Sequence, residues 1–228
     1  MSLRRALRGL ALLAACVLAT AAAAQEMRIP PADEAAQDPS WIAFRNRLLN
    51  ALQKHDSAFL LGITDRDVRN TTSGARGIAE FRKQWDLASG TSPVWQALAS
   101  ALFLGGAYVH PKQGPRELCA PYVLAKWPGE VDPFTHGAIV VDDAELKSEP
   151  SSSSATLQHL SYNVVAVADW DVADREAGTP QRWVKVSLGT HEGYVPAEHI
   201  RSPVELAACF VKGPGGWRMV AFAPAGGD

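Results

Sequence analysis

Residues 182–195, RWVKVSLGTHEGYV, decide the fold expected for the second half of the chain. Apolar and polar side chains alternate through the first part of this stretch, as expected for a β-strand with one buried face. Val184 and Val186 then point to one face, and Trp183 and Lys185 point to the other. A second short strand follows after turn residues, so the stretch predicts two β-strands close together in sequence.

Three more short strands are expected before this stretch, again separated by turn residues. They cover residues 138–141, 156–160 and 162–168. Many short strands interrupted by turns are typical of a small β-barrel. We therefore expect an all-β module in this part of the chain.

Four sequence motifs follow one another here: AELKSEPS at residues 144–151, TLQHL at 156–160, WVKV at 183–186 and GYV at 193–195. Their order and spacing resemble the bacterial Src-homology-3 (SH3-like) domain of cell-envelope proteins. The sequence departs from that family where SYN replaces a common Gly turn after TLQHL, and the loop at 169–182 is longer than usual. The resemblance implies an SH3-like barrel over residues 137–202.

SH3-like domains typically present an aromatic-lined groove to a peptide, so the resemblance also implies a binding site. If the valines fill the core, Trp183 points outward, and Tyr194 is out of phase with its neighbouring valine. These two aromatic residues would contact the ligand, with Lys185 or His191 at the rim. The alternative is that Trp183 packs under the 169–182 loop or against the helical part of the chain.

The first half of the chain is mostly helical by its apolar spacing. Residues 40–53 form an amphipathic pattern with Trp41, Phe44 and Leu48 on one stripe, and Ser40 is a candidate N-cap. Further helices are expected around residues 58–63, at 77–87 and from Ser92 to residue 104, and a short strand around 65–72.

Residues 41–87 are similar to the start of the nuclear-transport-factor-like (cystatin-like) α+β fold, and residues 205–224 form a hairpin like the end of that fold. Residues 117–127 predict a strand interrupted by Pro, hence an edge strand. We expect an α+β protein in which residues 39–136 plus 203–228 form one helical and antiparallel-sheet domain and the barrel is inserted before the C-terminal hairpin. The alternative is a serial order of helical domain, barrel and hairpin.

The first residues have the features of an export signal. Arg4, Arg5 and Arg8 precede an apolar run of about fifteen residues that ends in small residues, so residues 1–24 are expected to be a signal peptide. LAAC, ending at Cys16, also fits a lipoprotein box. Residues 25–38 are expected to be a flexible leader, the mature protein is expected in the periplasm, and no later stretch is apolar enough to span a bilayer.

The remaining cysteines, Cys119 and Cys209, form a disulfide in one interpretation and are buried thiols in the other. Three cysteines in all are too few for a zinc site made of four thiolates, and no histidine pair has the spacing of a helical zinc motif. We therefore expect no metal and no cofactor.

No nucleophile motif, phosphate loop or dinucleotide fingerprint is present, so no catalytic residue is assigned. The enzymatic alternative is an isomerase-like or small-molecule-binding pocket in the α+β domain. Asp56, Asp65 and Asp86 are the carboxylates available to it, although the first two also suit helix caps.

Charge excludes one further class of function. The chain has a net charge of −2, and without the three N-terminal arginines 19 basic residues stand against 24 acidic ones, which argues against nucleic-acid binding. The sequence thus predicts an exported, non-enzymatic envelope protein that binds a cell-wall peptide, such as a peptidoglycan stem, or scaffolds an envelope protein.

Overall fold

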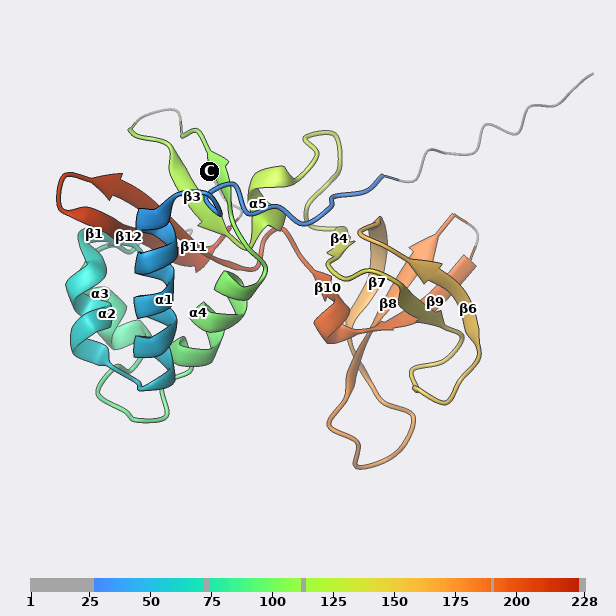
Figure 1. Ribbon diagram of the computed structural model, residues 1–228. Helices are drawn as coiled ribbons and strands as arrows, with labels where there is room; N and C mark the ends of the chain where they lie inside the picture. The colour runs from blue at the N-terminus through green and yellow to red at the C-terminus, as the bar shows by residue number, and fades with distance from the viewer. Residues whose placement is uncertain (1–26, 72–73, 112–113, 190, 226–228) are drawn as a thin grey trace, which may run out of the picture.

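The computed structural model describes residues 27–71, 74–111, 114–189 and 191–225. It is a mixed α+β structure with two mostly antiparallel sheets that lie side by side (Figure 1). The expected signal peptide and Cys16, the candidate lipoprotein cysteine, lie outside the described residues. Within the part of the chain that is described, no helix is both long and apolar enough to cross a membrane.

The first sheet has five strands in the order β1-β12-β11-β3-β2. The C-terminal hairpin of β11 and β12 forms its centre, with β1 parallel to β12 and the other pairs antiparallel. Its strands are β1 (Thr64–Arg69), β2 (Ala107–Val109), β3 (Glu117–Ala120), β11 (Leu206–Gly213) and β12 (Gly216–Pro224).

Four helices cover one face of this sheet (Figure 1). They are α1 (Pro39–Gln53), α2 (Ser57–Ile63), α3 (Ile78–Gln84) and α4 (Val94–Phe103). Because side chains alternate along a strand, Ala208 and Phe210 of β11 point into the helices whereas Cys209 points to the opposite face. The core between helices and sheet is filled by large side chains, including Trp41, Phe44, Phe81, Trp85, Trp95, Phe210, Trp217 and Phe222.

The start of α1 is held by Asp38 rather than by the expected Ser40. One carboxylate oxygen of Asp38 accepts hydrogen bonds from the backbone N–H of Ser40 at 2.8 Å and from its hydroxyl at 2.7 Å. The other accepts from the Lys212 ammonium at 2.9 Å, which ties the helix to the β11–β12 hairpin. Pro39 at the first helical position needs no N–H partner.

The second sheet has seven strands in the order β10-β4-β7-β8-β9-β5-β6. Among the described residues its hydrogen-bonded ladder does not close, so β6 and β10 are its edges. Val184 and Val186 point into its core, as the alternation predicted. The strands are β4 (His136–Ile139), β5 (Ala144–Lys147), β6 (Thr156–Leu160), β7 (Val164–Ala173), β8 (Arg182–Leu188), β9 (His191–Pro196) and β10 (Ile200–Arg201), with the short η1 (Ala197–His199) before β10.

All seven strands of the second sheet come between β3 and β11, which are neighbours in the first sheet. The chain therefore leaves the first sheet after β3, builds the second sheet and returns beside its starting point. The short helix α5 (Tyr122–Lys126) lies at the exit.

The sequence prediction for residues 117–127 is wrong in two respects. Only Glu117–Ala120 form a strand, because Pro121 follows the strand as the N-cap residue of α5 instead of interrupting it. Strand β3 is also not an edge, since β2 lies on one side of it and β11 on the other. The apolar residues on both sides of Pro121 fit a strand and a short helix equally well, so the sequence did not show where the strand ends and the helix begins.

Residues 27–38 are packed rather than forming the expected flexible leader. The backbone of Ile29 donates to Tyr162 O at 2.8 Å, and Val164 donates to Met27 O at the same distance, so the segment adds to the second sheet. Farther on, Glu34 N donates to Gly106 O at 2.8 Å, beside the first sheet. Residues 27–38 therefore form a strap that touches both sheets (Figure 1).

A small apolar cluster joins the two sheets beneath this strap. Ile29 packs with Tyr122 and Val123 of α5 and with Ala138 of β4. The Tyr122 hydroxyl donates to Ile29 O at 3.1 Å, and burial raises the pKa of Tyr122 to about 12. The strap was missed because its sequence combines Pro, Ala and acids without an apolar period, so no pattern marked Ile29 as buried.

We predict that Ile29→Ala lowers the free energy of unfolding by about 2 kcal/mol or more, because a side chain only 4% exposed leaves a cavity between the sheets. Ile42→Ala is the matched control, since Ile42 is 37% exposed on α1. Urea unfolding measures both variants. Equal stability of the two would contradict the role of the strap.

The Asp38 cap predicts a pH dependence. Hydrogen bonds from Ser40 and Lys212 hold the pKa of this carboxyl well below its usual range, so its contribution is present above the unfolded pKa and is lost as pH falls towards the folded pKa. Asp38→Ala should therefore be less stable than the wild type at pH 7, with the difference shrinking in acid below the unfolded pKa of about 3.9.

Asp38→Asn is the companion variant. Asn also caps helices, but it has no negative charge and cannot form the ion pair with Lys212. We expect intermediate stability at pH 7. A difference between wild type and Asp38→Ala that stays constant across the acid range would rule out the charge as its source.

Candidate functional site

The prediction that Trp183 points outward is wrong. Its side chain is only 2% exposed, and its indole N–H donates to Asp174 at 2.8 Å. Asp174 begins the long connection between β7 and β8, so this connection covers the ring, as the alternative interpretation held. Trp183 is therefore not available on the surface for a ligand.

Tyr194 and Lys185 do come together. They lie opposite each other on β9 and β8, and Lys147 of β5 lies opposite Tyr194 on its other side. Both Tyr194 and Lys185 are half-buried. The Lys185 ammonium contacts Glu192 at 2.6 Å, and this hydrogen bond raises the pKa of the lysine.

Lys185, Tyr194 and Lys147 thus form a row across three neighbouring strands. This row continues from Lys147 to Thr156 of the edge strand β6. The Lys147 ammonium is buried; it contacts Glu145 at 2.9 Å and the Thr156 hydroxyl at 3.0 Å. The hydrogen bond from Lys147 lowers the pKa of Glu145, and one from Thr156 adds to the effect. Tyr194 thus lies between two lysines whose charges are already paired.

His191 lies apart from this row. It is the first residue of β9, exposed and opposite Leu188. His191 and Tyr194 are three positions apart along β9, which corresponds to a distance of about 10 Å at the usual rise per residue of a strand. Of the four predicted ligand residues, the structure brings together Tyr194 and Lys185 and separates Trp183 and His191 from them.

Strand β6 is the feature that the sequence analysis missed. It is an edge of the second sheet, and its first four residues are exposed; Leu157 is 53% exposed. Natural edge strands are usually protected by charges, proline or a covering segment. TLQHL contains no Asp, Glu, Lys, Arg or Pro, which is the sequence signal that could have identified this edge. In the structure His159 contacts Asp143 at 2.8 Å, and the pairing of β6 with β5 is irregular at Leu146 and Lys147.

The three candidate carboxylates do not form a site. Asp56 accepts from the N–H of Phe59 at 2.9 Å and caps α2, and Asp65 pairs with Arg218 at 3.4 Å. Asp86 is exposed at the end of α3. Asp56 borders a surface hollow with Lys54 and Phe59, and neither Asp65 nor Asp86 lines it.

Cys119 and Cys209 form a disulfide between directly opposite positions of β3 and β11. Glu117, on the same face, accepts two hydrogen bonds from the guanidinium of Arg69, one of them at 3.0 Å. Within the described residues, Glu117 and the two cysteines lie close enough to hold a metal ion. The disulfide leaves neither sulfur as a thiolate, so the oxidised protein lacks the ligands that such an ion needs.

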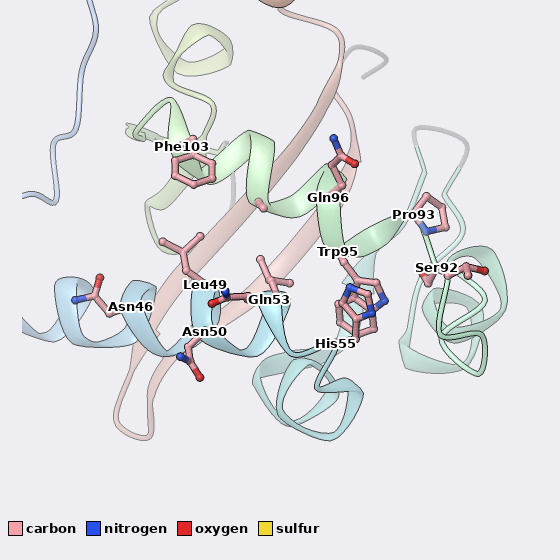
Figure 2. Close-up of a pocket in the computed structure, with 13 residues that line it drawn as sticks. Asn46, Leu49, Asn50, Gln53, His55, Ser92, Pro93, Trp95, Gln96 and Phe103 are labelled. Carbon is pink, nitrogen blue, oxygen red and sulfur yellow. The ribbon is translucent and has the colours of Figure 1, made fainter. Parts of the chain in front are cut away.

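A groove of about 770 Å³ runs between α1 and α4. Figure 2 places Leu49 and Gln53 of α1 between the two helices, with Phe103 at one end and the rings of His55 and Trp95 at the other. The volume falls within the usual range of ligand pockets. Sequence analysis assigned the apolar stripes of both helices but did not pair their polar residues across a groove.

No family model matches the chain, and neither a curated protein nor a solved structure matches it.

We predict that removing the disulfide with Cys119→Ala/Cys209→Ala lowers the free energy of unfolding by about 2–5 kcal/mol, because the bond closes a loop of sequence separation 90. Urea unfolding with and without a reductant measures this. The wild type should lose stability in reductant and the double variant should not respond. A wild type indifferent to reductant would contradict the bond.

Proposed function

We propose that the protein is a non-enzymatic component of the bacterial cell envelope that binds an extended peptide segment of a partner protein along strand β6. The observation that carries this proposal is the exposed, uncharged edge of the second sheet. An edge strand presents unpaired backbone N–H and C=O groups, and a peptide that adds as a further strand satisfies them.

The side chains around this edge favour a peptide as the ligand. In strand addition the main chain supplies affinity, and pockets for alternate side chains supply specificity. Leu157 offers an apolar contact to such a peptide. From Thr156 of β6 a cross-strand row leads to Lys147 of β5 and Tyr194 of β9, and it offers an aromatic side chain beside paired charges.

Two observations support a location in the envelope. The first 24 residues have the pattern of a signal peptide. The Cys119–Cys209 disulfide fits an oxidising compartment such as the periplasm. The resemblance of residues 138–202 to SH3-like domains of envelope proteins agrees with both, and it also favours a peptide ligand.

The enzymatic alternative has no comparable support. Asp56 caps α2, Asp65 of β1 pairs with Arg218, and Asp86 is exposed, and no observation places the three at a common cavity. A wall-binding role remains the competing form of the binding proposal, because a peptidoglycan stem is also a peptide.

We predict that immobilised protein enriches linear peptides from a display library and that Leu157→Lys abolishes their binding. A lysine on the edge opposes strand pairing, which is why natural proteins place lysine there. Phe134→Lys is the matched control, because it removes another exposed large apolar side chain away from β6. Fluorescence anisotropy with an enriched peptide measures the affinities.

Enrichment of no peptide, or equal binding by Leu157→Lys and the wild type, would overturn the proposal. Co-sedimentation with purified peptidoglycan sacculi forms a second arm. Sedimentation of both the wild type and Leu157→Lys with sacculi, without peptide binding, would assign the wall as the ligand instead.

A further inference from the structure

The second sheet carries the whole net charge of the chain that follows residue 24. Residues 137–202, which build this sheet, hold ten acidic and five basic side chains. The other residues after position 24 hold fourteen of each, so their net charge is zero. A surface with an excess of one charge attracts ligands of the opposite charge and repels ligands of the same charge. The part of the protein that contains β6 is therefore suited to a positively charged partner.

The basic side chains of this part of the chain do not offset the excess, because each of them already contacts a carboxylate. The pairs are Lys147 with Glu145, Arg175 with Glu149, Arg182 with Asp171, Lys185 with Glu192 and Arg201 with Glu205. The excess negative charge therefore belongs to the carboxylates outside these pairs.

Two of those carboxylates, Asp142 and Asp143, lie at one end of β6. They directly precede β5, which is antiparallel to β6, so they lie beside Leu160 at the end of β6. Both are exposed. Asp142 accepts a hydrogen bond from the Ser161 hydroxyl at 2.6 Å, and Asp143 contacts His159 at 2.8 Å. Within the described residues neither carboxylate pairs with a lysine or an arginine.

The other end of β6 is closer to electrical balance. Near the start of the strand, Glu145 pairs with Lys147 and Glu149 pairs with Arg175. Glu176 adds a third carboxylate near the turn before β6. The excess at this end is one negative charge, whereas Asp142 and Asp143 give two at the opposite end. The edge is therefore electrically asymmetric along its length.

The same charges disfavour a second copy of the chain as the occupant of this edge. Strand β6 lies at the outer margin of the second sheet, away from the first sheet (Figure 1). Pairing it with β6 of a second copy would bring two sets of the same carboxylates together, and like charges on neighbouring strands repel. A basic peptide brings the opposite charge to the same place.

We propose that the peptide that adds to β6 is basic and places a lysine or an arginine beside Asp142 and Asp143. In antiparallel addition, which is the commoner and slightly more stable arrangement, this is the N-terminal end of the peptide. The added strand lies two strand spacings from β5, about 10 Å, and a long basic side chain narrows this gap. The inference rests on the proposed strand addition to β6.

The test begins with a display library of linear peptides, selected on the wild-type protein. We expect the enriched peptides to carry a net positive charge, with Lys or Arg in their N-terminal half. Fluorescence anisotropy then measures the affinity of one enriched peptide at two salt concentrations. Binding should weaken from about 0.1 M to 1 M salt, because the Debye length falls from about 10 Å to about 3 Å.

Asp142→Asn/Asp143→Asn should weaken the binding of this peptide about threefold to tenfold, the range expected for two exposed ion pairs. Asparagine keeps the turn, since it tolerates the positive φ of 57° at Asp143. Asp86→Asn/Glu130→Gln is the matched control, because it also removes two exposed charges but lies outside residues 137–202. This control should bind like the wild type.

The outcomes separate this inference from the proposed function. Enriched peptides that are neutral or acidic and that Leu157→Lys no longer binds would overturn the inference and leave strand addition standing. Unchanged affinity of Asp142→Asn/Asp143→Asn would do the same, as would equal weakening by both double variants. Enrichment of no peptide, or no effect of Leu157→Lys, would overturn strand addition and this inference with it.

Discussion

The pairing of β3 with β11 is the constraint on which the rest of the structure depends. These strands are neighbours in the first sheet, yet the whole second sheet lies between them in sequence. Three residue pairs align them, and the central pair is the Cys119–Cys209 disulfide. Because the side chains alternate, the same short ladder places Leu118 and Phe210 in the helical core and the sulfurs on the opposite face. A failure here would separate β2 and β3 from the hairpin and leave it paired with β1 alone.

This constraint also fixes where the two candidate surfaces lie. The chain leaves β3 through α5, where Tyr122 and Val123 pack against Ile29 of the strap and against β4. The strap then holds the second sheet beside the first. The edge strand β6 and the groove between α1 and α4 lie on different sheets, far apart in the fold (Figure 1). Their chemistry differs as well, since the edge offers backbone groups and the lining of the groove includes amide side chains.

Periodic apolar patterns allowed the sequence to predict α1, the C-terminal hairpin and most strands of the second sheet. Features set by distant contacts were not predictable in this way. Trp183 is buried because Asp174 and its loop cover it, and alternation along β8 carries no information about that cover. The strap packs through Ile29 and Ala35, which have no apolar period around them. The edge position of β6 follows from strand order, and the groove from amides on two helices separated by about forty residues, which no local pattern records.

The most direct measurement is amide hydrogen exchange of the wild-type protein, free and bound to a display-selected peptide. If the peptide adds as a strand, the amides of residues 156–160 should gain protection, with little change in α1 and α4, because strand addition satisfies the outward backbone groups of β6. Protection confined to α1 and α4, or absent from β6, would contradict the account and move the peptide site elsewhere.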